Sequence, residues 1–259
     1  RSMRRIVRMD KDNTVLFAIE GGHRDPGTFF YAYDIAMGPA GDLYVHNGVL
    51  DEPGFFMVRE EILHYSPTGE FAGVIASRNY GADERRPELV QRTRLAGLSA
   101  TAERIRWFEI DGAGIHRYHA YPGKEAVENT ANIPLADADL LVAGIDEDAA
   151  GNIIYVSRRG EVVRVSGGTA TALFNADAET ARSIPQSVSA AGGRILFTDL
   201  GRRAIRLLGP DGGSTVLDND MVKKAMPDMP ESVFYRLADR TGVLATCTDY
   251  GVIISTADS

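Results

Sequence analysis

Short apolar runs separated by turns recur along the whole chain. The clearest example spans residues 183–220, where strand-like runs alternate with turns rich in Gly, Pro and Asp. Its four runs are Ile184–Ala190, Arg194–Asp199, Ala204–Leu208 and Ser214–Leu217. This pattern predicts a meander of antiparallel strands. A sheet of this size cannot bury both of its faces alone, so it needs neighbouring copies of itself.

Copies of this unit recur at a regular distance. The turn that precedes the second strand is found at Gly41-Asp42, Gly151-Asn152, Gly193-Arg194 and Gly242-Val243, with a weaker version at Ala102-Glu103. The spacing between these turns is about 42 to 62 residues, and the longer intervals contain insertions. Such a period is typical of the four-stranded blades of a β-propeller. We therefore predict an all-β fold, a β-propeller of four-stranded antiparallel blades.

The number of blades is five or six. Inner strands are predicted near Asp34, Leu98, Gly144, Val188 and Tyr235. Residues 1–20 form two outer strands without inner partners upstream. These strands either complete the blade of residues 231–259, which would remove an open sheet edge, or belong to a sixth blade. Residues 1–259 are predicted to be one propeller domain.

Two stretches interrupt the repeat. Residues 47–58 (NGVLDEPGFFMV) form an insertion between a second and a third strand. Residues 77–94 are strongly polar, and a helical turn is predicted within 84–92.

Composition excludes several classes of function. The chain of 259 residues is 44% hydrophobic, which is ample for a core, and its net charge of −8 argues against a nucleic-acid partner. The single cysteine rules out an intrachain disulfide. No run of 18 apolar residues occurs, so we expect no membrane span in this chain. Because strand-like sequence follows Arg1 almost at once, any anchor or targeting segment is expected to lie outside it.

Two segments carry a resemblance to a known family. GNIIYVSRRGEVVRVSGG and GGRILFTDLGRRAIRLLGPDG, which begin at Gly151 and Gly192, resemble the repeat of NHL-type propellers. In that repeat a Gly-Asn/Asp turn precedes a hydrophobic strand ending in Asp, and a Pro-Asp-Gly turn follows later. The resemblance implies a scaffold, commonly of six blades, that binds a ligand or protein across one face, as extracytoplasmic sensor and adaptor domains do. It carries no catalytic residues.

The SMP-30/gluconolactonase group shares this architecture and supplies the enzymatic alternative. Resemblance to these calcium-dependent lactonases would require a Glu, two Asn and an Asp to converge on the channel. Glu231, Asn132 and Asp146 are the candidates, although none lies in a matching local motif. A Ca²⁺ ion is expected only in that alternative, and no other cofactor is expected.

In a propeller, the loops that enter the inner strands and the loops between second and third strands lie on one rim, where ligands usually bind. Together with Asp34 on an inner strand, this topology gives a set of candidate ligand-binding residues: His23, Arg24, Tyr31, Asp34, His46, Asn47, Phe55, Phe56, Tyr80, Arg85, Arg158, Arg202 and Tyr250.

Two features of this rim suggest recognition. Phe55 and Phe56, side by side in a polar loop, would form an apolar contact patch; alternatively, one of them folds back over the blade. Arginines at 85–86, 158–159 and 202–203 would hold an acidic ligand; alternatively, they form salt bridges with nearby carboxylates.

The sequence thus predicts a non-enzymatic binding domain of a larger bacterial protein, in an extracytoplasmic setting. Its partner would be a small molecule or a protein at the loop rim. A lactonase-like hydrolase and a structural interaction platform, the latter with a possible homodimer, are the alternatives.

Overall fold

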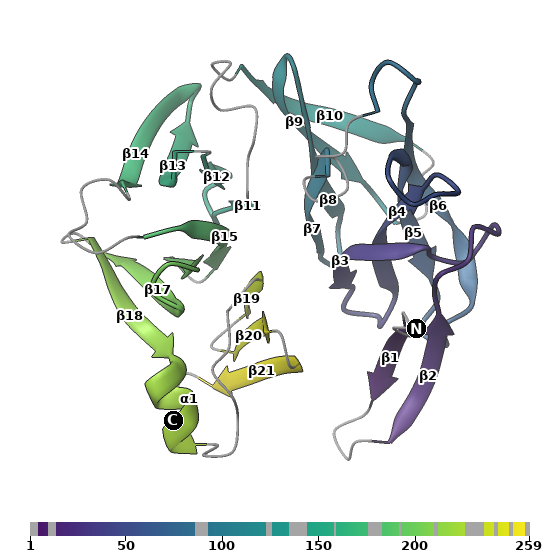
Figure 1. The fold of residues 1–259 in the computed structure, drawn as a ribbon. Helices are drawn as coiled ribbons and strands as arrows, with labels where there is room; N and C mark the ends of the chain where they lie inside the picture. Colours follow the sequence, from purple (N-terminus) through teal and green to yellow (C-terminus); the bar gives the residue numbers. More distant parts are fainter. Residues whose placement is uncertain are drawn as a thin grey trace. The chain divides into compact units, whose positions relative to one another are not determined.

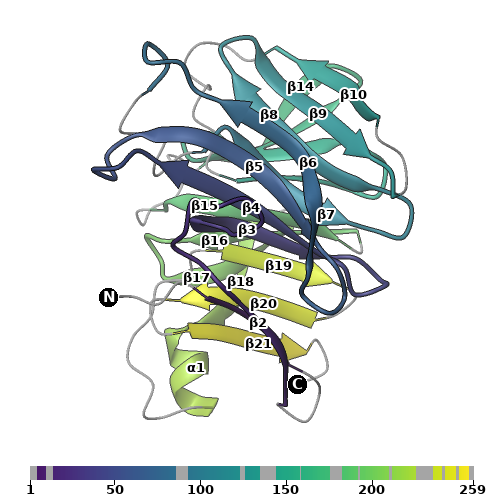
Figure 2. The same cartoon turned by 90° about the vertical axis from the view of Figure 1, so that its right-hand side faces the viewer.

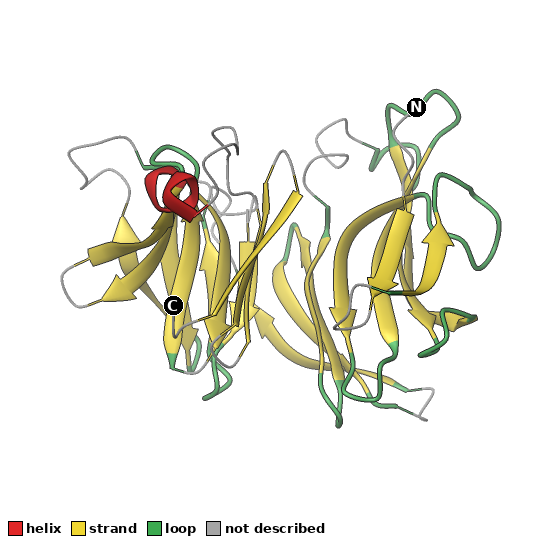
Figure 3. Ribbon diagram, turned by 90° about the horizontal axis from the view of Figure 1, so that it is seen from below, coloured by secondary structure: helices red, strands yellow, loops and turns green. Residues whose placement is uncertain are grey.

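The computed structural model describes residues 5–9, 14–85, 93–122, 126–134, 144–157, 159–175, 183–191, 193–209, 212–225, 236–240, 243–248 and 251–256. Within these ranges the regular structure is almost entirely β-strand, with one short helix (Figure 3). The chain divides into two compact units, residues 1–134 and 135–259, which are described separately below.

The first unit contains two four-stranded antiparallel sheets and a two-stranded ribbon (Figure 1). The ribbon pairs β1 (Arg5–Met9) with β2 (Val15–Glu20). The first blade consists of β3 (Tyr31–Met37), β4 (Leu43–Leu50), β5 (Met57–Tyr65) and β6 (Phe71–Asn79). The second blade consists of β7 (Leu95–Ala100), β8 (Ile105–Asp111), β9 (Gly114–Ala120) and β10 (Val127–Ile133). In both blades each strand pairs with the next one in sequence, as a meander requires.

The second unit repeats this arrangement. The third blade consists of β11 (Gly144–Glu147), β12 (Ile153–Val156), β13 (Glu161–Ser166) and β14 (Thr169–Asn175). The fourth blade consists of β15 (Pro185–Ala191), β16 (Arg194–Asp199), β17 (Ala204–Gly209) and β18 (Gly212–Asp218). A three-stranded sheet of β19 (Arg236–Arg240), β20 (Val243–Thr248) and β21 (Gly251–Thr256) follows.

The recurring turn before the second strand has the same backbone conformation in three blades. Gly41, Gly151 and Gly193 have φ angles of +92°, +81° and +76°, values that a side chain disfavours. In the first blade, the N–H of Gly38 donates to the carbonyl of Asp42 at 2.8 Å and closes the hairpin. This conformation is the physical reason for the Gly that the sequence repeats.

Neighbouring blades share a hydrophobic core within each unit. Between the first and second blades, Tyr44 and Ile62 pack with Trp107, which is 2% exposed. Figure 2 shows these two sheets side by side in the upper part of the view, with β5 and β6 next to β8 and β9. Between the third and fourth blades, Phe174 and Phe197 pack with their ring centroids 4.9 Å apart. Each blade therefore buries its apolar face against a copy of itself, as the repeat predicts.

The structure confirms an all-β propeller fold of four-stranded antiparallel sheets. Among the described residues, the C-terminal sheet has the three strands β19 to β21. In the described part of the chain, the ribbon β1–β2 pairs with no further strand, so its predicted place, in the C-terminal blade or in a sixth blade, stays a prediction. Residues 86–92, where most of the predicted helical turn falls, lie outside the described residues.

Two elements differ from the sequence prediction. Half of the insertion at 47–58 is strand, because β4 and β5 continue their pairing through Asn47–Glu61, Gly48–Glu60 and Leu50–Met57. Only residues 51–56 form the connecting loop. The second difference is α1 (Asn219–Ala225), which was not predicted.

The helix α1 is stabilised by a cap at its N-terminus, by basic residues in its last turn and by the burial of one apolar side chain. The carboxylate of Asp218 caps the first turn by accepting from the N–H of Met221 at 2.9 Å, and Lys223 and Lys224 occupy the last turn. Val222, 3% exposed, packs against the fourth blade.

No helix in the described ranges is long and apolar enough to cross a membrane.

Candidate functional site

Three loops of the first unit meet above one end of the first blade. They are the loop 21–30 that enters β3, the loop 51–56 between β4 and β5, and residues 80–85 after β6. We call these loops, together with Tyr31, the first-blade rim. Phe55 is its most exposed apolar side chain, at 67%, and Tyr31 is 40% exposed. His23 and Arg24 are also exposed.

The carboxylate of Asp51 fixes the loop that carries Phe55. Its Oδ1 accepts hydrogen bonds from the N–H groups of Phe55 (2.8 Å) and Phe56 (3.0 Å). The backbone of Asp51 also bonds to Phe56 and Gly54, so the loop closes on itself. The N–H of Phe56 above all, with those of Phe55 and Gly54 and the field of Arg85, holds the pKa of Asp51 below its usual range. Phe55 therefore projects from a loop whose backbone is locally fixed.

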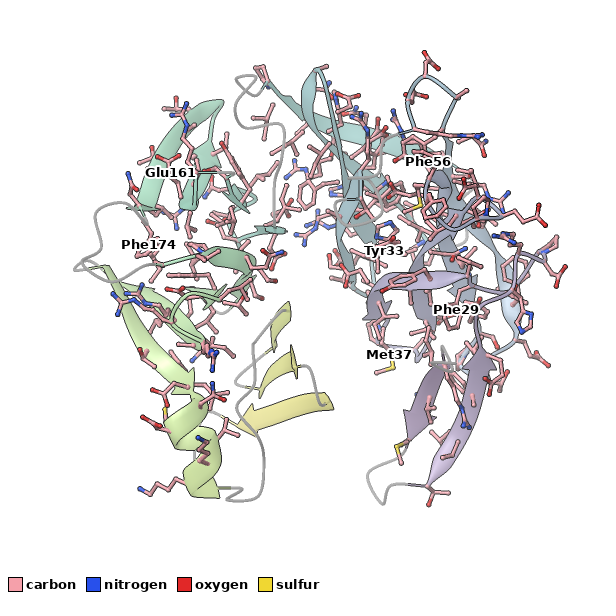
Figure 4. All side chains as sticks on the ribbon, viewed as in Figure 1. Phe29, Tyr33, Met37, Phe56, Glu161 and Phe174 are labelled. Carbon is pink, nitrogen blue, oxygen red and sulfur yellow. The ribbon has the colours of Figure 1, made fainter. Side chains whose placement is uncertain are left out.

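The two phenylalanines have different roles. Phe56 is half-buried, while the next residue, Met57, is fully buried in a cluster with Tyr33, Leu50 and Tyr80. Figure 4 shows Phe56 on the loop after β4 and Tyr33 on β3. Phe55 is thus the exposed member of this dipeptide, and Phe56 is half-buried.

Arg24 joins the entry loop to the loop 51–56. Its guanidinium donates to the carbonyls of Leu50 (3.2 Å) and Asp51 (2.6 Å) and lies 4.9 Å from the ring centroid of Phe30. The two loops are therefore held as one surface. Arg85 lies close by and donates to the carbonyl of Tyr80 at 3.4 Å.

His46 and Asn47 were predicted in the rim loop, and this placement is wrong because the hairpin β4–β5 is longer than expected. Both lie within β4 and are buried, at 2% and 1% exposed. The side-chain oxygen of Asn47 accepts from the N–H groups of Phe30 (2.8 Å) and Tyr31 (3.2 Å). Asn47 therefore supports the entry loop from below, and its buried side chain is already bonded to the protein.

Several hydrogen bonds below the rim meet at the carboxylate of Glu60, which lies on β5 and is fully buried. Oε2 of Glu60 lies 2.8 Å from Nε2 of His46, and Oε1 accepts from the hydroxyl of Tyr80 at 2.5 Å. The N–H groups of Arg94 and Leu95, at the start of the second blade, each donate to it at 2.9 Å. Glu60 therefore joins the loop after β6, the strand β4 and the next blade through one side chain.

The pKa values of this cluster follow from its bonds. Burial opposes ionisation of Glu60, but the hydrogen bond and the charge of His46, together with the bonds from Tyr80 and Arg94, keep its pKa below the usual range. Burial and the Glu60 carboxylate raise the pKa of Tyr80 far above that of a free phenol. Glu60 is thus a permanent anion near neutral pH, and Tyr80 stays protonated as its donor.

We expect Gly48→Ala to lower the free energy of unfolding by about 1–3 kcal/mol. A Cβ atom at Gly48 would lie 2.3 Å from the ring of Tyr33 and 2.8 Å from the methyl group of Met57. Both contacts are with buried side chains of the cluster below the rim, so they have little room to move. Urea unfolding measures the effect, and Gly112→Ala is the comparison, because a Cβ atom there meets nothing within 4 Å and the φ of Gly112 is not positive. An unchanged midpoint for Gly48→Ala would contradict the close packing.

Asp34 and the corresponding Asp146 bridge neighbouring inner strands. One oxygen of Asp34 accepts from the N–H of Leu98 on β7 at 3.2 Å. In the second unit, Oδ2 of Asp146 accepts from the N–H of Ala190 on β15 at 2.9 Å. The same residue type thus connects one blade to the next in both units.

In the second unit, Arg202 lies beside a buried carboxylate. Its backbone N–H donates to Asp199 at 3.2 Å, and its Nε lies 3.8 Å from the same carboxylate, which is fully buried. Asp199 also accepts from Ser183 (2.5 Å) and from the N–H of Ile184 (2.9 Å), so it anchors the loop that enters β15. Arg158 and Tyr250, as well as Arg86 of the proposed arginine set, lie outside the described residues.

Two of the three residues considered for a lactonase metal site, Asn132 and Asp146, are among the described residues. Asn132 lies on the outermost strand of the second blade, where its oxygen is 2.7 Å from Nδ1 of His116. Asp146 lies on an inner strand, and Glu231 is outside the described residues. Within the part of the chain that the structure describes, no group of three or more His, Cys, Asp or Glu side chains is placed to hold a metal ion.

The sequence analysis did not identify Glu60 as the buried support of the rim. It also did not identify Asp199 as the residue that anchors the loop entering β15. Asp199 had a signal, because the repeat predicts a hydrophobic strand ending in Asp. The sequence signal for Glu60 is weaker. Glu60 and Glu61 are adjacent in a strand, so one of the two side chains must face inward.

Comparison with solved structures identifies the fold. Virginiamycin B lyase from Staphylococcus aureus is similar at 14% identity, covering 96% of this chain and 72% of that one, with a TM-score of 0.53. A protein of unknown function from Bacteroides caccae gives a TM-score of 0.55 at 10% identity over 99% and 88% of the two chains. The nidogen/laminin complex gives 0.52 at 12% identity over 98% and 86%.

No protein-family model matches the sequence, and no curated protein matches it. At these identities the similar structures show the fold and not the activity. With the repeated four-stranded sheets described above, they establish that this chain has the β-propeller fold, which fits the resemblance of its sequence to NHL-type repeats.

Proposed function

We propose that this protein is a non-enzymatic binding module whose first-blade rim recognises a protein or peptide partner. The observation that carries the proposal is Phe55, two-thirds exposed at the tip of a loop whose backbone Asp51 fixes. A rigid, exposed aromatic side chain loses little conformational entropy on binding, which makes it a good anchor.

The neighbours of Phe55 suit a protein interface. Arg24 and Tyr31 lie on the same rim, and Arg and Tyr are residue types that frequently dominate binding energy. The buried Glu60 cluster below them keeps the supporting strands in place, as a precise binding surface requires.

The fold alone does not select between a binding protein and an enzyme. The similar structures include a lyase and a chain of the nidogen/laminin complex. We favour binding because the polar residues buried under the rim, His46, Asn47 and Glu60, are bonded to one another or to the backbone, as a support would be. An extracytoplasmic setting is kept as part of the proposal, and cell fractionation with an antibody against the chain tests it.

We expect Phe55→Ser to weaken the binding of selected peptides at least tenfold, corresponding to about 1.4 kcal/mol or more. Peptides would be selected from a displayed random library against the immobilised protein, and their dissociation constants measured by biolayer interferometry. Because Phe55 is exposed, the melting temperature should not change.

Leu16→Ser is the matched control, because Leu16 is 54% exposed on β2, away from the rim. It should leave peptide binding unchanged. Failure to enrich any peptide, or equal binding by the Phe55→Ser variant, would overturn the proposal. Sedimentation velocity of the same variants identifies a second copy as the partner if a dimer forms and Phe55→Ser dissociates it.

A further inference from the structure

A pocket lies at the opposite end of the first two blades from the rim. It has a volume of about 560 Å³ and is formed within the first unit, between the turn β3–β4 on one side and the turn β7–β8 on the other. The two turns lie at the far end of strands β4 and β8 from the loops of the rim. Its volume is within the range of small-molecule sites.

Apolar side chains supply most of the walls. Ile75, Ile105 and Ala120 line the pocket and also belong to, or pack against, the core between the two blades. The pocket is therefore the open end of that core, where Val74 and Val127 leave apolar surface exposed. Such walls favour a ligand with an apolar or aromatic body.

The polar part of the pocket is a carboxylate beside two stacked rings. Asp42, Tyr44 and His64 all line it. Oδ1 of Asp42 is 2.8 Å from Nε2 of His64, and in the described part of the chain no other donor bonds to this carboxylate. The rings of Tyr44 and His64 are stacked, with centroids 4.8 Å apart and an interplanar angle of 16°.

The lining side chains of the pocket favour positive charge, and the nearby guanidinium of Arg8 is bonded to the carbonyls of Gly41 (2.9 Å) and Pro67 (3.0 Å). The lining includes a carboxylate but neither Lys nor Arg. Burial and the Asp42 carboxylate raise the pKa of Tyr44. At the mouth, Tyr121 donates to Glu128 at 3.1 Å, and this bond raises the pKa of Tyr121 despite the opposing field of Arg104.

We propose that this pocket binds a small organic cation, an amine carried on an apolar or aromatic body. The ammonium group pairs with Asp42, while the body fills the apolar space between the blades. This site is separate from the partner site proposed at the first-blade rim.

Three indoles that share one ring and differ in head-group charge test the proposal. By isothermal titration calorimetry, tryptamine (cation) is expected to bind at least about fivefold more tightly than tryptophol (neutral), which corresponds to one ion pair of about 1 kcal/mol. Indole-3-acetate (anion) should bind more weakly than either. Asp42→Asn should remove the preference for tryptamine and leave tryptophol binding within about twofold.

A bulky substitution locates the site. Ala102 is an exposed lining residue on the turn β7–β8, so Ala102→Trp fills the mouth without entering the core and should abolish binding. Ala113→Trp places the same side chain on the exposed turn at the other end of the second blade and should leave binding unchanged. Phe55→Ser should also have no effect, which separates this proposal from that for the rim.

The proposal is overturned if tryptamine shows no binding at about 1 mM. It is also overturned if indole-3-acetate binds as tightly as tryptamine, or if Ala102→Trp binds like the unmodified protein. Circular dichroism of each variant establishes that it is folded before titration.

Discussion

Glu60→Gln is expected to lower the free energy of unfolding by about 3–5 kcal/mol, a large fraction of the stability of a typical domain. Glu60 is fully buried and its two oxygens accept from His46, Tyr80, Arg94 and Leu95. A Gln amide has the same shape, but its NH₂ group must face donors that previously met an oxygen. The midpoint of urea unfolding should therefore fall while the slope stays the same.

Glu70→Gln is the control for the loss of one negative charge. Glu70 is exposed on the turn before β6, so its replacement should change stability by less than about 0.5 kcal/mol. A loss of less than about 1 kcal/mol for Glu60→Gln would mean that the buried network contributes little.

Lowering the pH should reduce the difference in the free energy of unfolding between the Glu60→Gln variant and the unmodified protein. The pKa of Glu60 is depressed in the folded state, so its stabilising effect is complete above the pKa of an unfolded Glu, about 4.3. It is lost as the pH falls through the lower folded-state value. Unfolding curves at neutral pH and below about pH 4 provide the measurement; a constant difference would contradict ionisation of Glu60.

The organisation of the blades could be predicted from the sequence, whereas the support of the rim could not. The turns at Gly41, Gly151 and Gly193 require a backbone conformation that glycine favours, so the repeat is visible in the residues themselves. The hydrogen bonds of Glu60 reach residues 34 and 35 positions further along the chain. A long-range bond of this kind leaves no local pattern, so the charged residue is easily taken for a solvent-facing one.

The positions of the rim residues were also hard to predict, because they depend on pairing between strands and not on local sequence alone. His46 and Asn47 were placed in a loop because the insertion at 47–58, which interrupts the repeat, begins directly after His46. In the structure, pairing with β5 continues as far as Leu50, and the turn-forming residues that follow it mark the actual loop. Local propensity identified that a turn exists, but tertiary pairing set where the strand ends.

Asp199→Asn is expected to lower the free energy of unfolding by about 3–5 kcal/mol through an effect in the second unit. Asp199 is fully buried, and Nη1 of Arg206, itself only 4% exposed, lies 3.4 Å from it. Removing the carboxylate charge leaves the guanidinium of Arg206 without this buried counter-ion. The loop that enters β15 also loses a charged acceptor at Ser183 and Ile184.

Asp220→Asn is the matched control because Asp220 is exposed in the first turn of α1, where a charge contributes about 1 kcal/mol at most. Equal stability of Asp199→Asn and Asp220→Asn would contradict the role of the buried ion pair. Thermal unfolding monitored by calorimetry gives both values.

The two carboxylate variants together test whether residues 1–259 form one domain. Glu60 belongs to the first compact unit and Asp199 to the second. In a single cooperative domain, both substitutions shift one common transition. Two transitions, each shifted by only one of the variants, would contradict the single-domain prediction.

The loop 51–56 is held by its own hydrogen bonds, so it can carry different binding sequences on the same scaffold. The bonds between Asp51, Gly54 and Phe56 fix the ends of the loop, whereas the side chains of Glu52 and Pro53 are exposed at its tip. Mutations at positions 52, 53 and 55 can therefore accumulate at little cost to folding. Libraries randomised at these three positions therefore offer a route to engineered binders.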